Sequence, residues 1–265
     1  MRVARNALRA GHQVTALTRN EERGEEWKPL GITPIFGDVL NPASLRSLPA
    51  ADVCLYAVGY DRTARADKRT VYVDGLRNVL MEIRQRVPRL IFISSTSVYG
   101  QQAGEIVDES SPCEPDQENG RICCDAEEVV REFGKGAVIL RLSGLYGPGR
   151  LIARKEQLLQ GTPLEGSPQT WLNLIHVDDA ARAFQLLTDQ SASSPLYLLS
   201  DEVPLRRGDF YGAIARHIGA PEPIFSGQEG LPLGKRCDSS LIRKELNFSF
   251  QYPDAVSAIQ KMDDL

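Results

Sequence analysis

The sequence predicts an α/β protein with an open, doubly wound parallel sheet, and three observations carry this prediction. Short apolar runs alternate with helix-patterned stretches over most of the 265 residues. Residues 90–93 form an apolar run of the length expected for a strand covered on both faces. Ser94, Ser95 and Thr96 follow it directly, at the place where parallel sheets bind their ligands. A chain of this length suits one large domain, with or without a small appended lobe.

The elements follow one another at short intervals. A helix over residues 1–10 opens the chain, because its apolar residues have helical spacing and Gly11 is a good C-terminal stop. Strands are expected over 13–17, 33–36, 52–58, 90–93, 138–142 and 196–199. Further helices are expected over 21–27, 67–86, 209–218, 239–246 and 253–262. Another includes Ala126-Glu127 and runs to Phe133.

Composition excludes several classes of protein. Hydrophobic residues make up 42% and charged residues 25%, with a net charge of -4, which indicates a globular protein without a basic surface for nucleic acid. No apolar run approaches the length of a membrane span. The five cysteines show no C-x-x-C spacing and the three histidines lie far apart, so neither a disulfide framework nor a metal centre is expected.

A family resemblance rests first on residues 89–100, Arg-Leu-Ile-Phe-Ile-Ser-Ser-Thr-Ser-Val-Tyr-Gly. This stretch resembles the active-site strand of extended short-chain dehydrogenases/reductases, the NAD-dependent epimerase/dehydratase group. Residues 72–80, 141–149 and 171–179 resemble further segments of that family. The resemblance implies a Rossmann-like fold, and it places Ser95 where the family keeps its catalytic Ser or Thr. The alternative is that small hydroxyl residues simply end a strand and begin a turn.

The resemblance also implies an NAD(P) site. Residues 11–19 resemble the family's second strand and its end. An arginine at that end, here Arg19, accommodates the 2′-phosphate of NADP, whereas an acid favours NAD. Asp38 is also a plausible helix cap before Pro42, so that alternative stays open. The residues expected at the cofactor are Arg19, Asp38, Val39, Ala57, Val58, Gly59 and Ser94.

The segments 141–149 and 171–179 resemble family segments that close over substrate. The residues expected to bind substrate are Thr96, Arg150, Asn173 and His176. His176 has a second reading as a buried structural group, and the adjacent acids Asp178 and Asp179 are read as a helix cap favoured by the helix dipole.

Two departures from the family stand out in the expected active site. The pair Ala126-Glu127 sets the register of the family's Tyr-x-x-x-Lys, and it places Asn119 in the tyrosine position and Cys123 in the lysine position. Neither side chain can replace a phenol made acidic by an ammonium group. We therefore expect Tyr99 or Tyr146 to supply the proton. This region resembles an atypical branch of the family, and Tyr72 also replaces an asparagine that the family uses near the active site.

The other departure is at the start of the chain. The family opens with a central strand and a G-x-x-G-x-x-G loop that binds pyrophosphate, whereas residues 1–5 resemble only the helix after that loop. A sheet without its first strand has two unpaired edges in its middle. We expect these 265 residues to bind NAD(P) poorly and to associate through those edges, and a chain extended upstream to bind well.

The sequence thus predicts one Rossmann-like unit over residues 1–265, with a substrate lobe contributed mainly by 145–176 and 200–265. The expected function is that of an NAD(P)-dependent oxidoreductase or epimerase/dehydratase acting on a nucleotide sugar or a related carbonyl or hydroxyl compound. The alternative is a non-catalytic dinucleotide-sensing or protein-binding module. The expected partner is a small-molecule substrate, without nucleic acid or membrane. The expected location is cytoplasmic, and a homodimer is left open.

Overall fold

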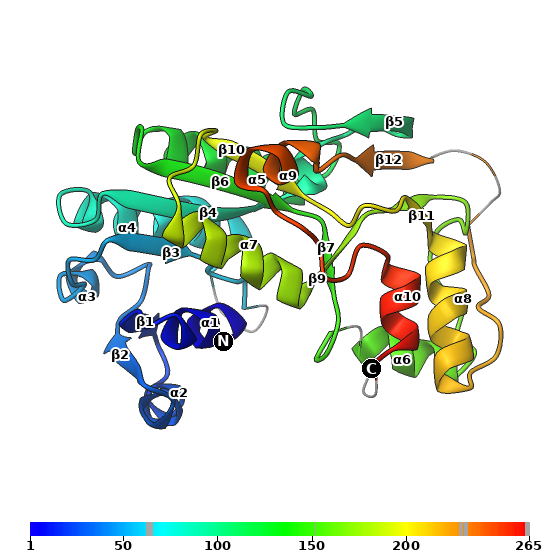
Figure 1. Cartoon of the computed structure of the whole chain (residues 1–265), viewed down its shortest axis with the longest axis horizontal. Coiled ribbons are helices and arrows are strands. Elements are labelled where there is room, and N and C mark those ends of the chain that lie inside the picture. The colour runs from blue at the N-terminus through cyan, green and yellow to red at the C-terminus, as the bar shows by residue number, and fades with distance from the viewer. Residues whose placement is uncertain (62–65, 151, 228–229, 231–232, 263–265) are drawn as a thin grey trace. The chain divides into compact units, whose positions relative to one another are not determined.

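The structure, a computed structural model, describes residues 1–61, 66–150, 152–227, 230 and 233–262 (Figure 1). The chain divides into two compact units. Unit 1 contains Met1–Val98, Pro115–Leu140 and Ala181–Leu196. Unit 2 contains Tyr99–Glu114, Arg141–Ala180 and Tyr197–Leu265.

Parallel strands form the framework of unit 1. Strand β1 (Val14–Thr18) pairs in parallel with β2 (Ile32–Phe36). Strand β3 (Val53–Tyr56) pairs in parallel with β4 (Arg89–Ser95) and belongs to a four-stranded sheet. The order of that sheet is β10-β6-β4-β3, with β6 at Ala137–Leu142 and β10 at Leu196–Leu199, of which Arg141–Leu142 and Tyr197–Leu199 are counted with unit 2. The prediction of an α/β fold with a parallel sheet is confirmed.

Two strands of unit 1 have an open side. Among the described strands β1 pairs only with β2, and β3 pairs only with β4. The backbone groups along the other side of each strand therefore have no ladder partner in the described part of the chain.

The helices associated with these strands agree with the apolar patterns. They are α1 (Arg2–Arg9), α2 (Glu21–Trp27), α3 (Pro42–Leu45), α4 (Gly75–Ile83), α5 (Glu118–Arg131) and α7 (Val177–Asp189). Short turns of helix lie at η1 (Lys28–Leu30), η2 (Thr70–Asp74) and η3 (Thr96–Val98), and η2 is a π-helical turn that runs directly into α4. The core includes Leu76 of α4, Leu90 of β4 and Val130 of α5, each with no exposed surface. The helices predicted over residues 1–10, 21–27, 67–86 and up to 133 are present as α1, α2, α4 and α5, whereas α3 does not appear in the prediction.

Unit 2 contains shorter strands. Strand β7 (Gly144–Tyr146) pairs in parallel with β9 (Leu174–His176), and β5 (Ala103–Val107) pairs in parallel with β12 (Gly234–Cys237). Strand β8 (Trp171–Leu172) is antiparallel to β11 (Leu205–Arg206). The helices are α6 (Ile152–Leu159), α8 (Arg207–Ile218), α9 (Ser240–Leu246) and α10 (Ala255–Gln260), of which α6, α8 and α10 lie together in Figure 1. Phe210, Ile214 and Ile259 are buried between them.

Several strands of unit 2 do not appear in the sequence-based prediction. Strand β12 reads Gly-Lys-Arg-Cys, without apolar alternation, and it is a strand only because β5 offers it a partner from a distant part of the chain.

Two predicted elements are shorter in the structure. The predicted strand over 52–58 ends at Tyr56, and the predicted helix over 253–262 is limited to Ala255–Gln260. No helix in the described ranges is long and apolar enough to cross a membrane.

Candidate functional site

The end of β4 is the first part of the site in unit 1. Leu90, Ile91 and Phe92 are buried, so β4 is covered on both faces, and it ends at Ser94 and Ser95. The Ser94 hydroxyl donates a hydrogen bond of 2.6 Å to the Glu127 carboxylate on α5. Glu127 is 1% exposed, and its other oxygen accepts from Arg131 at 3.1 Å. This buried bond ties α5 to the strand end that the sequence predicts as the active site.

Ser95 has a different environment from Ser94. Its hydroxyl oxygen accepts a hydrogen bond of 3.1 Å from the backbone N–H of Ser97, a turn typical of serine after a strand. Among the residues that the structure describes, no acceptor takes the Ser95 hydroxyl hydrogen. Both readings of Ser95 therefore fit the structure: it shapes the turn, and it can also donate to a substrate oxygen. Thr96 is buried in η3, with 8% of its surface exposed.

Helix α5 approaches the turn after β4 at a glycine. A Cβ atom at Gly120 would overlap the Ser97 carbonyl oxygen, so only glycine permits this approach. One turn along the helix, the Cys123 thiol accepts a hydrogen bond of 3.8 Å from the Ser97 hydroxyl. Burial raises the pKa of Cys123, which keeps the thiol protonated at neutral pH. Asn119 and Cys123, the residues in the tyrosine and lysine positions, thus lie beside this turn.

Sequence reasoning missed a cation at this place. The Lys68 ammonium donates a hydrogen bond of 2.8 Å to the Asn119 side-chain oxygen, from the helix that leads through η2 into α4. The same ammonium lies 5.0 Å from the centre of the Tyr72 ring. A Lys-x-x-x-Tyr spacing on the helix predicted over 67–86 is the only signal that the sequence offers for this pair.

The residues expected at the cofactor lie at the ends of β1, β2 and β3. Arg19 follows β1, and its guanidinium lies 3.3 Å from the Asp61 carboxylate after β3 and 3.9 Å from the Asp38 carboxylate after β2. Three strand ends therefore meet around one arginine. Ala57 and Gly59 are exposed after β3, and a Cβ atom added to Gly59 would meet nothing within 4 Å. Val58 is partly buried against the core of unit 1.

Asp38 and Val39 form the turn after β2. The Asp38 carboxylate accepts a hydrogen bond of 2.9 Å from Leu40 N–H, and Val39 is buried against Gly75. The residue that caps α3 is Asn41, so the alternative reading of Asp38 as the cap of this helix is wrong. The physical reason is local: the Asp38 side chain closes its own turn two residues further on.

Tyr99, in unit 2, is a buried and fully engaged phenol. Its hydroxyl donates to the Asp108 carbonyl oxygen at 2.7 Å and accepts from the Arg141 guanidinium at 2.8 Å. Tyr99 and Arg141 are 1% and 2% exposed. Burial raises the pKa of Tyr99, and Arg141 opposes that change only in part. This environment does not favour proton transfer to a substrate.

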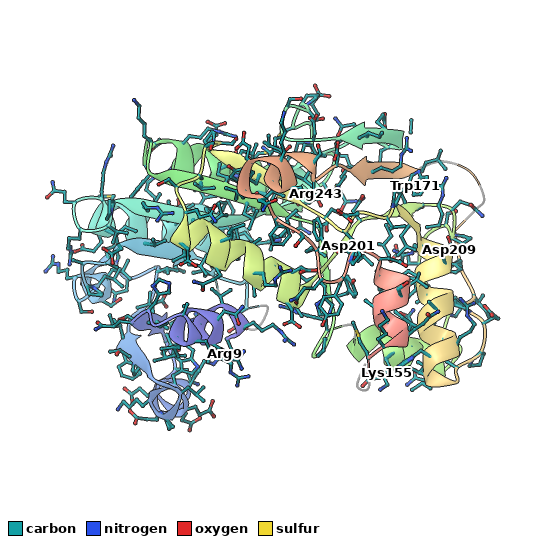
Figure 2. The ribbon with its side chains drawn as sticks, in the orientation of Figure 1. Arg9, Lys155, Trp171, Asp201, Asp209 and Arg243 are labelled. Atoms are coloured by element: carbon teal, nitrogen blue, oxygen red, sulfur yellow. The ribbon has the colours of Figure 1, made fainter. Side chains whose placement is uncertain are left out.

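Tyr146, His176 and Asp201 form a buried cluster in unit 2, and Asp201 is labelled in Figure 2. The Tyr146 hydroxyl and both Asp201 carboxyl oxygens have no hydrogen-bond partner of normal geometry in the described ranges. The two groups still affect each other's ionisation. Burial raises the pKa of Asp201 to about 8, so this carboxyl keeps its proton at neutral pH.

His176 is 1% exposed, which fits the structural reading better than substrate contact. Its ring stacks on Tyr252 at 3.7 Å, and its Nδ1 accepts from the backbone N–H of Asp178 at 3.2 Å. Asp179, read from sequence as part of a helix cap, also joins a distant segment, because its carboxylate accepts from the N–H groups of Gln251 and Tyr252.

The two remaining substrate candidates differ in access. The Asn173 amide donates to the Lys235 carbonyl oxygen at 2.9 Å and accepts from Cys237 N–H at 2.8 Å, so it is used to hold β12. Arg150 is exposed.

Beside Asp201 a cavity of about 10 Å³, lined partly by Asn173 and Cys237, offers the room of one water molecule. Among the described residues no group of three or more His, Cys, Asp or Glu is arranged to hold a metal ion.

The chain resembles known proteins over most of its length. The model of the NAD dependent epimerase/dehydratase family matches residues 1–197. The chain belongs to this family. Protein YeeZ of Escherichia coli (strain K12) is 32% identical over 219 residues, which cover 82% of this chain and 77% of YeeZ. A 3-diazoavenalumate denitrifying reductase of Streptomyces sp is 26% identical over 240 residues, which cover 82% of this chain and 77% of the reductase.

Solved structures share the fold. A structure from Methylobacillus flagellatus, named as an NAD-dependent epimerase/dehydratase, has a TM-score of 0.78 and 29% identity, and covers 97% of this chain and 90% of its own. The Bordetella bronchiseptica enzyme WbmH in complex with NAD+ has a TM-score of 0.82 and 17% identity, covering 98% of this chain and 91% of WbmH. The predicted Rossmann-like fold is therefore confirmed.

Proposed function

We propose that the chain is an NAD(P)-dependent oxidoreductase or epimerase/dehydratase that acts on a nucleotide sugar or a related carbonyl or hydroxyl compound. The observation that carries this proposal is the end of β4. There Ser95 keeps a hydroxyl hydrogen for a substrate oxygen, while the buried Ser94–Glu127 bond holds α5 against the strand end. A positioned hydroxyl of this kind stabilises negative charge that develops on a reacting oxygen.

The residues around Arg19 fit the adenosine end of a dinucleotide. Carboxylates such as Asp38 and Asp61 are suited to ribose hydroxyls, and the open surface at Gly59 allows a ligand to approach the backbone. When bound, the dinucleotide supplies hydride transfer. We propose NAD as the preferred form, because a 2′-phosphate at Arg19 would meet two carboxylates that already neutralise the guanidinium. Arg19 by itself favours NADP, but the two carboxylates beside it outweigh that preference.

The test combines binding and turnover. Calorimetric titration with NAD and NADP measures the two affinities, and absorbance at the reduced nicotinamide band follows oxidation of UDP-glucose or reduction of 4-nitrobenzaldehyde. Weak but saturable dinucleotide binding together with turnover of either class of compound is the expected result. Absence of dinucleotide binding in both titrations would contradict the proposal.

A second candidate is a non-catalytic dinucleotide-sensing or protein-binding module. It is favoured by one observation: Asn119 and Cys123 occupy the positions of the acid–base pair, while Tyr99 and Tyr146 are buried. Tight dinucleotide binding without any turnover would support this candidate.

Two further proposals concern the setting of the protein. We propose a cytoplasmic location, because none of the five cysteines forms a disulfide within the described residues, as is usual in a reducing compartment. We also propose a homodimer, which light scattering tests by measuring the molar mass in solution.

A further inference from the structure

Lys68 is a cation without an acidic partner. In the described part of the chain no carboxylate forms an ion pair with its ammonium, whereas the adjacent Arg69 pairs with Asp125 of α5. Its bond to the neutral Asn119 amide uses one of the three ammonium hydrogens. The residue is partly buried, and its ammonium and the bond to Asn119 face solvent. Two hydrogens and a full positive charge are thus available to an acceptor.

The start of the helix fixes the direction of Lys68. Asp67 caps this end, because its carboxylate accepts from Thr70 N–H at 2.9 Å and from the Thr70 hydroxyl at 2.8 Å. The π-helical turn η2 begins at Thr70 and contains Tyr72 between the buried residues Val71 and Val73. Turns of this kind are frequent at functional sites. Cap and turn together hold the Lys68 ammonium against the Tyr72 ring at 5.0 Å.

This pair lies next to the end of β4. Lys68 is bonded to Asn119, and Cys123, one turn further along α5, is bonded to Ser97. The positive charge of Lys68 lowers the pKa of Cys123 against the larger effect of burial, and the Cys123 thiol in turn affects the pKa of Tyr72. The groups therefore form one continuous polar cluster within unit 1. Asn119 and Cys123 do not supply an acid themselves, but a neighbouring helix brings one to them.

We propose that Lys68 donates the proton to the reacting oxygen at the end of β4, with Asn119 and Tyr72 as positioning residues. This inference rests on the proposed function. In a carbonyl reduction a bound reduced dinucleotide would supply the hydride to the carbonyl carbon, whose C=O π bond breaks. The oxygen then takes a proton from the Lys68 ammonium, which becomes a neutral amine and regains a proton from water. Ser95 holds the same oxygen through its hydroxyl hydrogen.

Three substitutions at Lys68 distinguish proton donation from a purely structural role of this side chain. Lys68→Met keeps the apolar stem and removes the charge, and Lys68→Arg keeps the charge but is a very poor proton donor. Each should lower kcat for 4-nitrobenzaldehyde reduction by about 10²- to 10⁴-fold. The affinity for NADH, measured by calorimetry, should change less than about threefold. Added methylamine should restore part of the turnover of Lys68→Ala. The exposed Lys135→Met is the matched control and should behave as the wild type.

A readout without cofactor tests the geometry. In protein labelled with ¹³Cζ-tyrosine, the Tyr72 resonance is assigned by Tyr72→Phe and titrated with pH. Loss of the nearby positive charge in Lys68→Met should raise the pKa of Tyr72, and Lys135→Met should leave it unchanged.

The outcomes of the two proposals can be told apart. Full turnover in Lys68→Arg, or an unchanged Tyr72 titration in Lys68→Met, would overturn the role of Lys68 and leave the proposed function standing. Absence of turnover of both probes by the wild type would overturn the catalytic role together with the enzyme proposal.

Discussion

The Ser94 hydroxyl and the Glu127 carboxylate are joined by a buried hydrogen bond of 2.6 Å. Glu127 is 1% exposed, so this bond and the one from Arg131 satisfy a charge that would be costly to bury alone. Strand β4 and helix α5 are therefore locked together at the place where the candidate catalytic groups lie.

Removal of this lock should destabilise the protein. We expect Glu127→Ala to lower the free energy of unfolding by about 1–3 kcal/mol, because Ser94 loses its acceptor and a cavity replaces the side chain. Urea unfolding followed by circular dichroism measures the change. Glu128→Ala is the matched control, since its side chain is 73% exposed on the same helix and also pairs with Arg131. Equal losses in the two variants would show that the buried bond adds nothing.

Ser95→Ala should abolish turnover while leaving the fold intact. The Ser95 hydroxyl accepts one bond from a backbone N–H within a turn and carries none of the core, so its loss should alter unfolding by less than about 1 kcal/mol. The loss of a group that stabilises a developing oxyanion should lower kcat by about 10²-fold or more. Steady-state kinetics and thermal unfolding on the same preparation check both parts. Unchanged kcat would remove Ser95 from the site.

Arg19 and Asp61 should set the choice between NAD and NADP in opposite directions. Arg19→Asp replaces attraction by repulsion at the 2′-phosphate and should weaken NADP binding relative to NAD. Asp61→Asn removes one of the two carboxylates beside the guanidinium and should strengthen NADP binding relative to NAD. Calorimetric titrations with both dinucleotides give the ratio of affinities. If the ratio is the same in wild type and both variants, Arg19 lies outside the cofactor site.

Asp201 should make the stability of the protein depend on pH. Burial raises its pKa to about 8 in the folded state, whereas an unfolded aspartate titrates near 4. Between these values the folded state binds more protons than the unfolded state, so stability falls as pH rises from about 4 to about 8 and then levels off. Each pKa unit of difference corresponds to about 1.4 kcal/mol.

Asp201→Asn keeps the shape of the protonated carboxyl and should remove this fall in stability. The free energy of unfolding of the variant, relative to that of the wild type, should therefore increase as pH rises. Urea unfolding at a series of pH values measures the difference. Asp209→Asn, an exposed change in the first turn of α8, is the control and should keep the wild-type pH dependence. A constant gap between Asp201→Asn and wild type from pH 4 to pH 8 would mean that the carboxyl is not held in its protonated form.

Much of the framework can be predicted because its signals are local. A continuous apolar run locates the strand around Leu90, and the spacing of apolar residues locates the helix around Leu76. Small polar residues mark the end of the strand. The pair Ala126-Glu127 gives a register for α5, and it agrees with a buried Glu127 facing β4. The strand β12 could not be predicted, because its residues have no strand preference and depend on β5 for pairing.

The candidate site is less accessible to sequence reasoning. Lys68 and Asn119 are 51 positions apart, and neither residue type signals the other. Tyr146 and Asp201 become a pair with altered ionisation only because both are buried in the same core. No local pattern encodes a contact of this kind.

The sequence by itself determined the alternation of strands and helices, the family and the polar end of β4, since these depend on residue type and on spacing along the chain. Only the tertiary structure decided that Tyr99 is enclosed by Arg141 and Asp108, that Asp201 is buried beside Tyr146, and that Lys68 reaches Asn119. The physical reason is that burial and electrostatic contact depend on which segments pack together, and the free energy of that packing is shared among residues far apart in the chain.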